Sequence, residues 1–144
     1  MLANRSIPSS TVIPELAYPD LSEAIDWLSA AFGFTLRIRI ADHRAQLTIG
    51  DGAIVVIQHP RAGAITPIAH SLLVRVPDAD LHYANAVSHG ARIVRPPATY
   101  PYGERQYTAA DHIGRSWTFS QSVADVDPLD WGGTPGALTK KLSS

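Results

Sequence analysis

Residues 18–34, YPDLSEAIDWLSAAFGF, form the stretch of sequence that decides the fold. Asp20 is a good N-cap for a helix, and Glu23 three residues later completes a capping box. Gly33 is a common residue at the C-terminal end of a helix. Between them, apolar residues recur at helical spacing: Leu21, Ala24, Ile25, Leu28 and Phe32. The stretch therefore predicts an amphipathic helix.

Strands are predicted on both sides of this helix. Residues 34–40 alternate between apolar and polar side chains, which is the period of a β-strand. Residues 45–49 and 53–58 are two further β-rich runs, joined through Gly50-Asp51-Gly52, and Asp-Gly between such runs is typical of a hairpin. Before the helix, residues 11–18 form a short apolar run whose Pro14 favours an edge strand.

The same order of elements then begins again. Residues 72–76 alternate as a strand does, Pro77-Asp78 repeats Pro19-Asp20, and His89-Gly90 repeats Phe32-Gly33 at the end of a second helical segment. Further strands are predicted over residues 91–94, 105–110 and 116–121, with a proline-rich loop over 95–102 and a turn over 111–114. Two passes of strand, helix and three strands indicate an internal duplication.

This duplication predicts an α+β fold. We expect two βαβββ modules that form a cupped mixed sheet around a pocket, with the helices on the outside, because the helix of one module covers only one face of its sheet. We expect a single domain over residues 1–144. Its parts are a first module (10–58), a linker (59–69), a second module (70–122) and a C-terminal tail (123–144).

Composition excludes several classes of function. Hydrophobic residues make up 45% of the chain and charged residues 17%, which is typical of a globular protein. The formal net charge of -1 argues against nucleic acid as a partner. The absence of cysteine excludes disulfides and thiolate chemistry. We find neither a signal-peptide pattern nor an apolar run long enough to span a membrane, so we expect a cytoplasmic protein.

Several short motifs follow one another in an order typical of a known superfamily. They are Tyr18-Pro19-Asp20, Ala31-Phe32-Gly33-Phe34, Val74-Arg75-Val76-Pro77-Asp78, Gly90-Ala91, Tyr102-Gly103-Glu104-Arg105, Asp111-His112-Ile113-Gly114 and Trp117-Thr118-Phe119. Over residues 10–122 the chain thereby resembles the vicinal oxygen chelate superfamily, which includes glyoxalase I, extradiol dioxygenases and bleomycin resistance proteins. The usual turn of its closing hairpin is Asp-Pro-Asp-Gly, of which this chain keeps Asp111 and Gly114.

The resemblance implies a place for a divalent metal, which enzymes of the superfamily hold with His and Glu from the first and fourth strands of each module. The positions that match here are Ile13, Ser71, Val55 or Val56, and Thr118. None of these is a good ligand for Zn²⁺, Ni²⁺ or Fe²⁺, so we expect no metal and no cofactor. A shift of register by one residue would bring in His70 instead of Ser71, and Glu15 is a second oxygen donor.

Six residues are candidates for binding a ligand: Glu15, His70, Arg75, Glu104, Arg105 and Tyr107. Arg75 lies between two apolar strand residues, so its side chain is expected to face the cavity, where it could bind an anion bidentately or pair with Glu15. The run of residues 102–107 is interpreted as the rim of the pocket. The alternative is a hydrogen-bonded bracket for the closing hairpin.

Other polar and aromatic residues have simpler interpretations. Trp117 and Phe119 are expected to lie in the core, and Trp27 is expected to pack beside its helix. His82 is expected to be exposed on a helix. Arg37 and Arg39 either line the other half of the cup or face solvent. The remaining histidines lie in predicted turns or ends and are expected to be solvated: His43, His59, His89 and His112.

These observations favour a metal-independent small-molecule binding protein that resembles the bleomycin-resistance and uncharacterised glyoxalase-like branches. It would hold its ligand in an apolar cup with a few polar anchors, without a chemical step. The resemblance also implies a homodimer. One alternative is a metal-dependent lyase, isomerase or dioxygenase with ligands from His70, Glu15 and Glu104. Another is a metal-free enzyme with Glu104 or Glu15 as general base.

Overall fold

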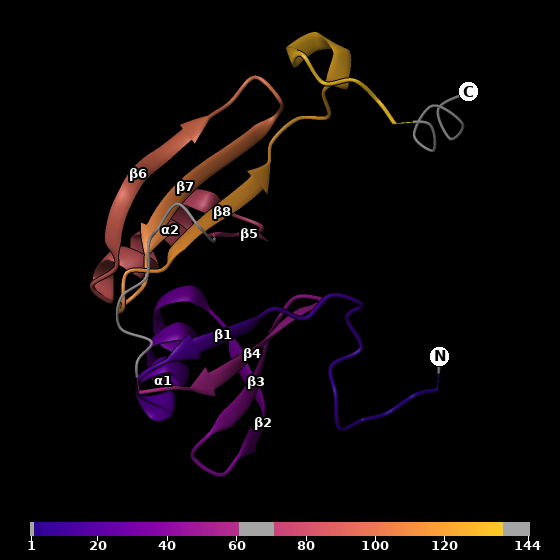
Figure 1. Ribbon diagram of the computed structural model, residues 1–144. Coiled ribbons are helices and arrows are strands. Elements are labelled where there is room, and N and C mark those ends of the chain that lie inside the picture. Colours follow the sequence, from indigo (N-terminus) through magenta and orange to yellow (C-terminus); the bar gives the residue numbers. More distant parts are fainter. Residues whose placement is uncertain (1, 61–70, 137–144) are drawn as a thin grey trace.

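The structure is a computed structural model that describes residues 2–60 and 71–136, and it contains the expected repeat of elements (Figure 1). The first module consists of β1 (Glu15–Tyr18), α1 (Leu21–Phe32), β2 (Thr35–Ile40), β3 (Arg44–Ile49) and β4 (Gly52–Gln58). The second consists of β5 (Ser71–Arg75), α2 (Ala79–Ser88), β6 (Arg92–Thr99), β7 (Glu104–Ala110) and β8 (Ser116–Ser122). A short 3₁₀ helix, η1 (Pro128–Trp131), follows.

Each module forms one four-stranded mixed sheet. The strand orders are β1-β4-β3-β2 and β5-β8-β7-β6. The first strand of each module pairs parallel with the fourth, and the other neighbours pair antiparallel. Because the two sheets have the same order and the same mixture of pairings, the structure confirms the predicted α+β fold of two βαβββ modules. Among the described helices, none is long and apolar enough to cross a membrane.

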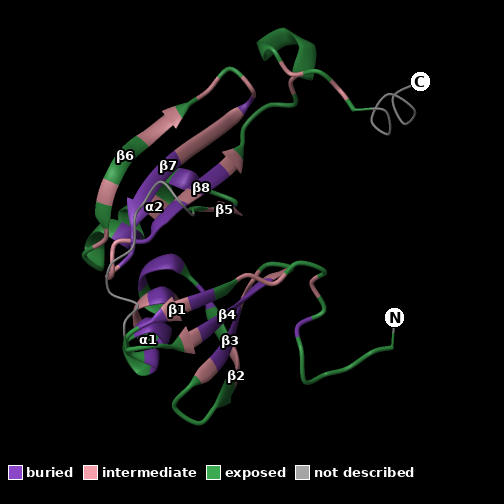
Figure 2. Ribbon diagram, viewed as in Figure 1, coloured by how far each residue is buried: buried purple, intermediate pink, exposed green. Residues whose placement is uncertain are grey.

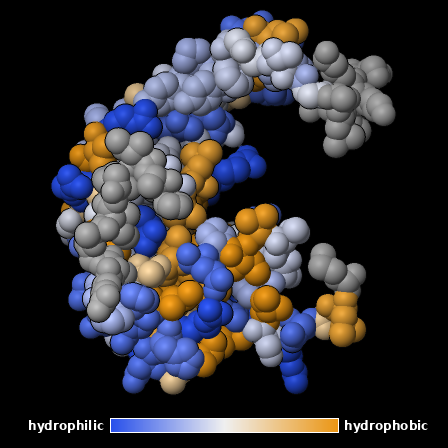
Figure 3. Space-filling model, viewed as in Figure 1, coloured by the Kyte–Doolittle hydropathy of each residue, from blue (hydrophilic) through white to orange (hydrophobic). Residues whose placement is uncertain are grey.

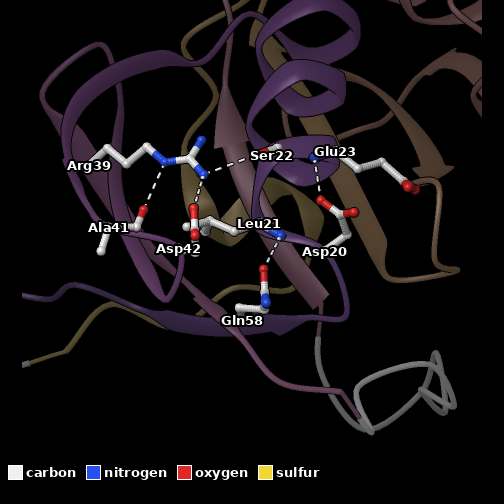
Figure 4. Close-up of polar contacts among 8 residues, drawn as sticks. All are labelled: Asp20, Leu21, Ser22, Glu23, Arg39, Ala41, Asp42 and Gln58. Carbon is white, nitrogen blue, oxygen red and sulfur yellow. Dashed lines mark hydrogen bonds and ion pairs between the residues drawn. The ribbon is translucent and has the colours of Figure 1, made fainter.

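Local hydrogen bonds explain why α1 begins where it does (Figure 4). The Asp20 carboxylate accepts a hydrogen bond from the backbone N–H of Glu23 at 2.9 Å, which satisfies a donor that the first turn of a helix leaves free. The side-chain oxygen of Gln58, at the end of β4, accepts a second bond from the N–H of Leu21 at 3.0 Å. The helix start is thereby fixed to the parallel strand pair.

The helix-covered faces of both sheets contribute to one continuous core (Figure 2). Phe32 at the end of α1 lies 4.8 Å from Phe119 and 5.5 Å from Trp117, measured between ring centroids. Trp117 and Phe119 are fully buried, as the sequence predicts. Trp27 is half-buried and packs edge-on against Phe32. The aromatic side chains of the second module therefore complete the core of the first.

The strands differ from the sequence prediction at two places. The prediction of a loop over residues 95–102 is wrong for residues 95–99, because β6 runs through Pro96 and Pro97 to Thr99; residues 100–102 lie in the connection to β7. Proline lacks a backbone N–H, but β6 is an edge strand with irregular register, where that donor is not needed for the sheet. The first strand begins at Glu15 rather than at residue 11, since β1 pairs with β4 only from Glu15 onward.

Two histidines that were expected to face solvent lie between the modules instead. His82 on α2 contacts the Tyr107 hydroxyl through Nδ1 and the carbonyl oxygen of Phe32 through Nε2, the latter at 2.9 Å. His112 stacks on Tyr18 at 5.5 Å and tilts against Trp27 at 5.3 Å, with 11% of its side chain exposed. The prediction failed for both because each contacts the other module, and sequence spacing carries no information on such contacts.

Candidate functional site

Each sheet has one face that no helix of its own module covers, called here its helix-free face. In the second sheet, alternation along the strands places Tyr107, Trp117 and Phe119 in the core. The residues between them belong to the helix-free face: Leu73, Arg75, Glu104, Gln106, Thr108, Thr118, Ser120 and Ser122. All of these residues except Leu73 are polar, so the helix-free face of the second sheet does not form a second hydrophobic core.

A chain of hydrogen bonds crosses this face. The Tyr102 hydroxyl donates to the side-chain oxygen of Gln106 at 3.0 Å, and the Gln106 amide nitrogen donates to the Ser120 hydroxyl at 3.0 Å. Ser120 in turn donates to Glu104 at 2.6 Å. Hydrogen bonds from Ser120 and Ser122, together with the nearby Arg75 guanidinium, lower the pKa of Glu104. Glu104 is therefore a fixed negative charge at neutral pH.

Two arginines lie on the same surface. An Nη of Arg75 lies 3.4 Å from the Ser122 hydroxyl, and an Nη of Arg95 donates to the Thr108 hydroxyl at 3.1 Å. Thr108 and Thr118 are themselves joined at 2.8 Å. A guanidinium has five N–H donors, and each of these bonds uses one. The arginines can thus bind an acceptor on a ligand without losing their place on the sheet.

An apolar cleft of ≈ 310 Å³ lies between the modules, beside Arg75. It is lined by Val12 and Pro14, which precede β1, by Phe34 and Trp117, and by the β3–β4 hairpin and β5. The space-filling view shows the molecule hollowed between the second module and residues that precede β1, with apolar side chains at its borders (Figure 3). Leu73, on β5 within this cleft, is 66% exposed. An apolar cleft with a guanidinium in its wall suits a ligand that is mostly apolar and carries an acceptor group.

Of the six predicted site residues, the structure brings Arg75 and Glu104 together on one face. Glu15 lies on the first sheet, where its ion partner is Arg44 at 2.8 Å rather than Arg75. His70 lies outside the described residues.

Arg105 and Tyr107 lie on the opposite side of β7 from Glu104. Arg105 binds Asp80 at the start of α2 at 2.9 Å, and Tyr107 is only 1% exposed, beside His82. Arg105 and Tyr107 therefore do not lie beside Glu104 on a common pocket rim, as the sequence analysis expected. Residues 104 and 105 alternate in direction because the run is a strand and not a loop. The same period of two places Gln106 on the side of Glu104; it lay within the predicted rim but was not named as a ligand-binding candidate.

The described residues do not fit a divalent metal. No group of three or more His, Cys, Asp or Glu that could hold one occurs among residues 2–60 and 71–136. Where the first and fourth strands pair, the helix-free positions are Glu15 opposite Val55 and Leu73 opposite Thr118. Only Glu15 has a ligand's chemistry, and Arg44 neutralises it.

Comparisons with known proteins identify relatives of this fold. Residues 11–119 match the family model of the glyoxalase/bleomycin resistance protein/dioxygenase superfamily. TioX from Micromonospora sp. ML1 is 34% identical with a TM-score of 0.66, over 82% of this chain and all of TioX. A bleomycin resistance determinant encoded on transposon Tn5 is 21% identical with a TM-score of 0.63, over 81% of this chain and all of that one.

A glyoxalase-related enzyme from Fulvimarina pelagi is 17% identical with a TM-score of 0.63, over 78% of this chain and 88% of that one. These last two likenesses concern the fold alone. No curated protein matches the chain. The family model covers most of the chain, and it includes both modules except the end of β8. The chain therefore belongs to the glyoxalase/bleomycin resistance protein/dioxygenase superfamily.

Proposed function

We propose that this protein binds a small molecule, without a metal, in the cleft between its modules and over the helix-free face of the second sheet. The observation that carries the proposal is the position of Arg75. Its side chain borders the apolar cleft and lies on the same face as the polar network that ends at Glu104. Apolar walls beside a few fixed polar groups are the usual composition of a ligand site.

The chemistry of these groups defines the ligand class. Arg75 suits a carboxylate or phosphate, which a guanidinium binds bidentately. Glu104 suits a donor such as an amine or amide N–H, because the network keeps its carboxylate ionised. The ligand would therefore be an apolar molecule with an anionic or carbonyl group next to a donor. Arg105 and Tyr107 are not part of this proposal, since both face α2.

A homodimer is part of the proposal. Leu73 exposes an apolar side chain in the cleft, and a second copy laid over it would enclose a ligand that one chain leaves half-open. Glu15 of the second copy is then a candidate anchor from the facing surface.

The enzymatic alternatives find less support. A general base works best when its pKa is close to neutral, whereas the network around Glu104 lowers the pKa of that carboxyl. A metal-dependent reaction needs about three protein ligands, and the described residues do not supply them together. A binding role uses the same groups without either requirement.

Two measurements test this proposal. First, the metal content of untagged protein is determined by plasma mass spectrometry, after incubation with Zn²⁺, Ni²⁺, Mn²⁺ or anaerobic Fe²⁺ and desalting. Less than about a tenth of an equivalent of each supports metal independence, and close to one equivalent overturns it. Second, a panel of apolar carboxylates and their methyl esters is screened by thermal shift, and hits are titrated calorimetrically.

The matched variants are Arg75→Ala and Arg39→Ala, the latter an arginine whose ion partner is the exposed Asp42. Loss of a guanidinium contact to a ligand carboxylate should weaken binding about tenfold or more in Arg75→Ala. Arg39→Ala should bind as the wild type does, and both variants should keep the thermal midpoint nearly unchanged. Equal affinities of wild type and Arg75→Ala would remove Arg75 from the site.

A further inference from the structure

The helix-free face of the second sheet carries a second arginine, Arg95, in addition to Arg75. Arg95 lies on the edge strand β6 and is exposed. Its guanidinium nevertheless leans inward over the sheet, because an Nη donates to the Thr108 hydroxyl at 3.1 Å, and Thr108 is only 5% exposed. Arg95 is therefore held over the helix-free face instead of extending into solvent.

The charge of Arg95 is not offset by a nearby acid. Arg75 has the charge of Glu104 close to it, and Arg105, on the other side of the sheet, binds Asp80 at 2.9 Å. Arg95 forms no ion pair with a carboxylate among the residues that the structure describes. Because a guanidinium stays protonated in proteins, Arg95 makes its edge of the face attractive to an anion.

The internal repeat shows what an arginine in this arrangement binds. In the first module, one Nη of Arg37 donates to the side-chain oxygen of Gln46, which lies on β3 opposite β4 as Thr108 lies on β7 opposite β8. The other Nη donates to the carbonyl oxygen of Arg5, outside the sheet, at 2.8 Å. Within the described part of the second module, Arg95 makes the first kind of contact and not the second. Its other N–H groups can therefore donate to an acceptor on a ligand.

Arg75 and Arg95 are too far apart to bind the same acidic group. The guanidinium of Arg75 lies beside Ser122 on β8. That of Arg95 lies beside Thr108, which is opposite Thr118, four residues before Ser122 on β8. Four residues of a strand span about 13 Å, so the two guanidinium groups are roughly 14 Å apart. A single carboxylate or phosphate can reach only one of them.

A row of paired residues leads from the apolar cleft to Arg95. Leu73, which is 66% exposed in the cleft, lies opposite Thr118. Thr118 lies opposite Thr108, and Thr108 lies opposite Arg95. The two hydroxyls are bonded to each other and to Arg95, so an apolar chain can cross them without leaving a buried polar group unpaired. The row thus suits the apolar body of a ligand whose far end is anionic.

We propose that Arg95 is a second anchor of the ligand site, and that the ligand is an extended molecule with an acidic group at each end. One acidic group would bind Arg75 beside the cleft, and the other would bind Arg95 at the opposite edge of the sheet. The apolar body between them would lie along Leu73 and the two threonines. This inference rests on the proposed function, to which it adds the length and the second charge of the ligand.

The test uses linear dicarboxylates, from malonate to dodecanedioate, and the monomethyl ester of each, titrated calorimetrically into the full chain. A dicarboxylate long enough to reach both guanidinium groups should bind about tenfold or more tightly than its monomethyl ester, because it makes a second charge-assisted contact. Malonate is too short to span the roughly 14 Å between the anchors and should show no such preference.

Three variants assign the preference to its residue. Arg95→Gln should remove the preference for the dicarboxylate and leave the affinity for the ester nearly unchanged, since the ester still binds at Arg75. Arg95→Lys should keep part of the preference, because the charge remains and the bidentate geometry is lost. The control, Arg105→Gln, removes the same charge from the opposite side of the same sheet and should keep the whole preference. Because Arg95 is exposed, the thermal midpoint of its variants should stay close to that of the wild type.

The outcomes separate this inference from the proposed function. If the wild type binds each dicarboxylate and its ester equally, and Arg75→Ala weakens both, the second anchor is overturned and the proposed function stands. Equal loss of the preference in Arg95→Gln and Arg105→Gln would assign it to overall charge and would also overturn the anchor. Failure of every carboxylate to bind the wild type would overturn the proposed function and this inference together.

Discussion

Asp111 is the residue that ties the two modules together. One oxygen of its buried carboxylate accepts hydrogen bonds from the Tyr18 hydroxyl at 2.7 Å and from the Trp117 indole at 3.0 Å. The other accepts the backbone N–H groups of Ile113 and Arg115. Burial, followed by the charge of Asp111, raises the pKa of Tyr18 well above its usual range, so the phenol remains a donor. The Asp retained from the superfamily's closing turn thus has a structural role here.

Asp111→Ala should therefore lower the free energy of unfolding by about 3–5 kcal/mol, because it leaves buried donors from both modules without an acceptor. The measurement is urea unfolding followed by tryptophan fluorescence. Asp26→Ala, an exposed carboxylate on α1, is the control and should cost little. A small effect at Asp111 would mean that water replaces the carboxylate.

His82 gives the module contact a pH dependence. The Phe32 carbonyl can only accept, so Nε2 carries the proton, and Nδ1 accepts from the Tyr107 hydroxyl. Burial, partly opposed by the hydrogen bond to Phe32, lowers the pKa of His82 below its usual 6.5. A lowered pKa in the folded state means that the unfolded chain binds the proton more readily. The stability that neutral His82 contributes is present above pH 6.5, the usual pKa of histidine, and is lost as the pH falls through the lower pKa that His82 has in the folded state.

We therefore expect the wild type to lose more stability than His82→Gln between pH 7.5 and pH 5. Glutamine has an amide donor and an acceptor but does not titrate in this range. Urea midpoints across the range provide the measurement, and His43→Gln, an exposed histidine, is the control. Parallel pH profiles of wild type and His82→Gln would assign the acid sensitivity to other groups.

At the scale of elements, Gly103 joins the start of β7 to the chain that follows β8. Gly103 has a φ of 85°. Its N–H donates to the carbonyl oxygen of Tyr100, and its own carbonyl oxygen accepts the N–H groups of Val123 and Ala124. A Cβ at this position would lie 2.4 Å from the carbonyl oxygen of Ala124. The tail then continues to Trp131, whose ring lies 5.3 Å from that of Tyr102.

Gly103→Ala should consequently destabilise the protein by about 2 kcal/mol or more, since strain and collision add. It should also release Trp131 from Tyr102, which fluorescence quenching by acrylamide would detect. Gly50→Ala is the matched control. Gly50 also has a positive φ, of 55°, but a Cβ there meets nothing within 4 Å, so the cost should be about 1 kcal/mol. Equal costs would mean that the tail moves away freely.

At the scale of the whole molecule, the core lies where the two modules meet, and the helix-free faces are left for other partners. Contacts such as Phe32 with Phe119 make the modules one folding unit. Residues that precede β1 lie on the helix-free face of the first sheet, where Gln46 donates to the carbonyl oxygen of Ser6. The helix-free face of the second sheet leads to the apolar cleft and Leu73. Different occupants of two similar faces are the main asymmetry of this duplicated chain.

A homodimer that closes the cleft should be weakened by a charge in it. Leu73→Glu should raise the dissociation constant of the dimer about tenfold or more, because it buries an unpaired carboxylate. Leu81→Glu is the control, an equally exposed leucine in the separate groove of ≈ 620 Å³ beside α2. Sedimentation equilibrium of both variants provides the comparison. Weakening by Leu81→Glu alone would place the second copy on α2 instead.

The sequence by itself determined the elements whose signals are local. The cap at Asp20, the stripe from Leu21 to Phe32 and the positive φ at Gly33 depend on neighbouring residues, so α1 and its repeat could be predicted. Period-two alternation likewise predicted the buried Trp117 and Phe119. The first part of β6 was predicted, but its continuation over residues 95–99 was missed, because prolines argue against a strand unless it is known to lie at an edge.

Only the tertiary structure decided which side chains share a surface. Arg75 and Glu104 meet on one sheet because β5 and β7 both flank β8, whereas Arg105 and Tyr107 face the helix. Pairs such as His82 with Phe32 are far apart in the chain, and nothing in local spacing specifies them. The alternation of a strand assigns its residues to two faces, but which of these faces packs against a helix depends on how the modules pack.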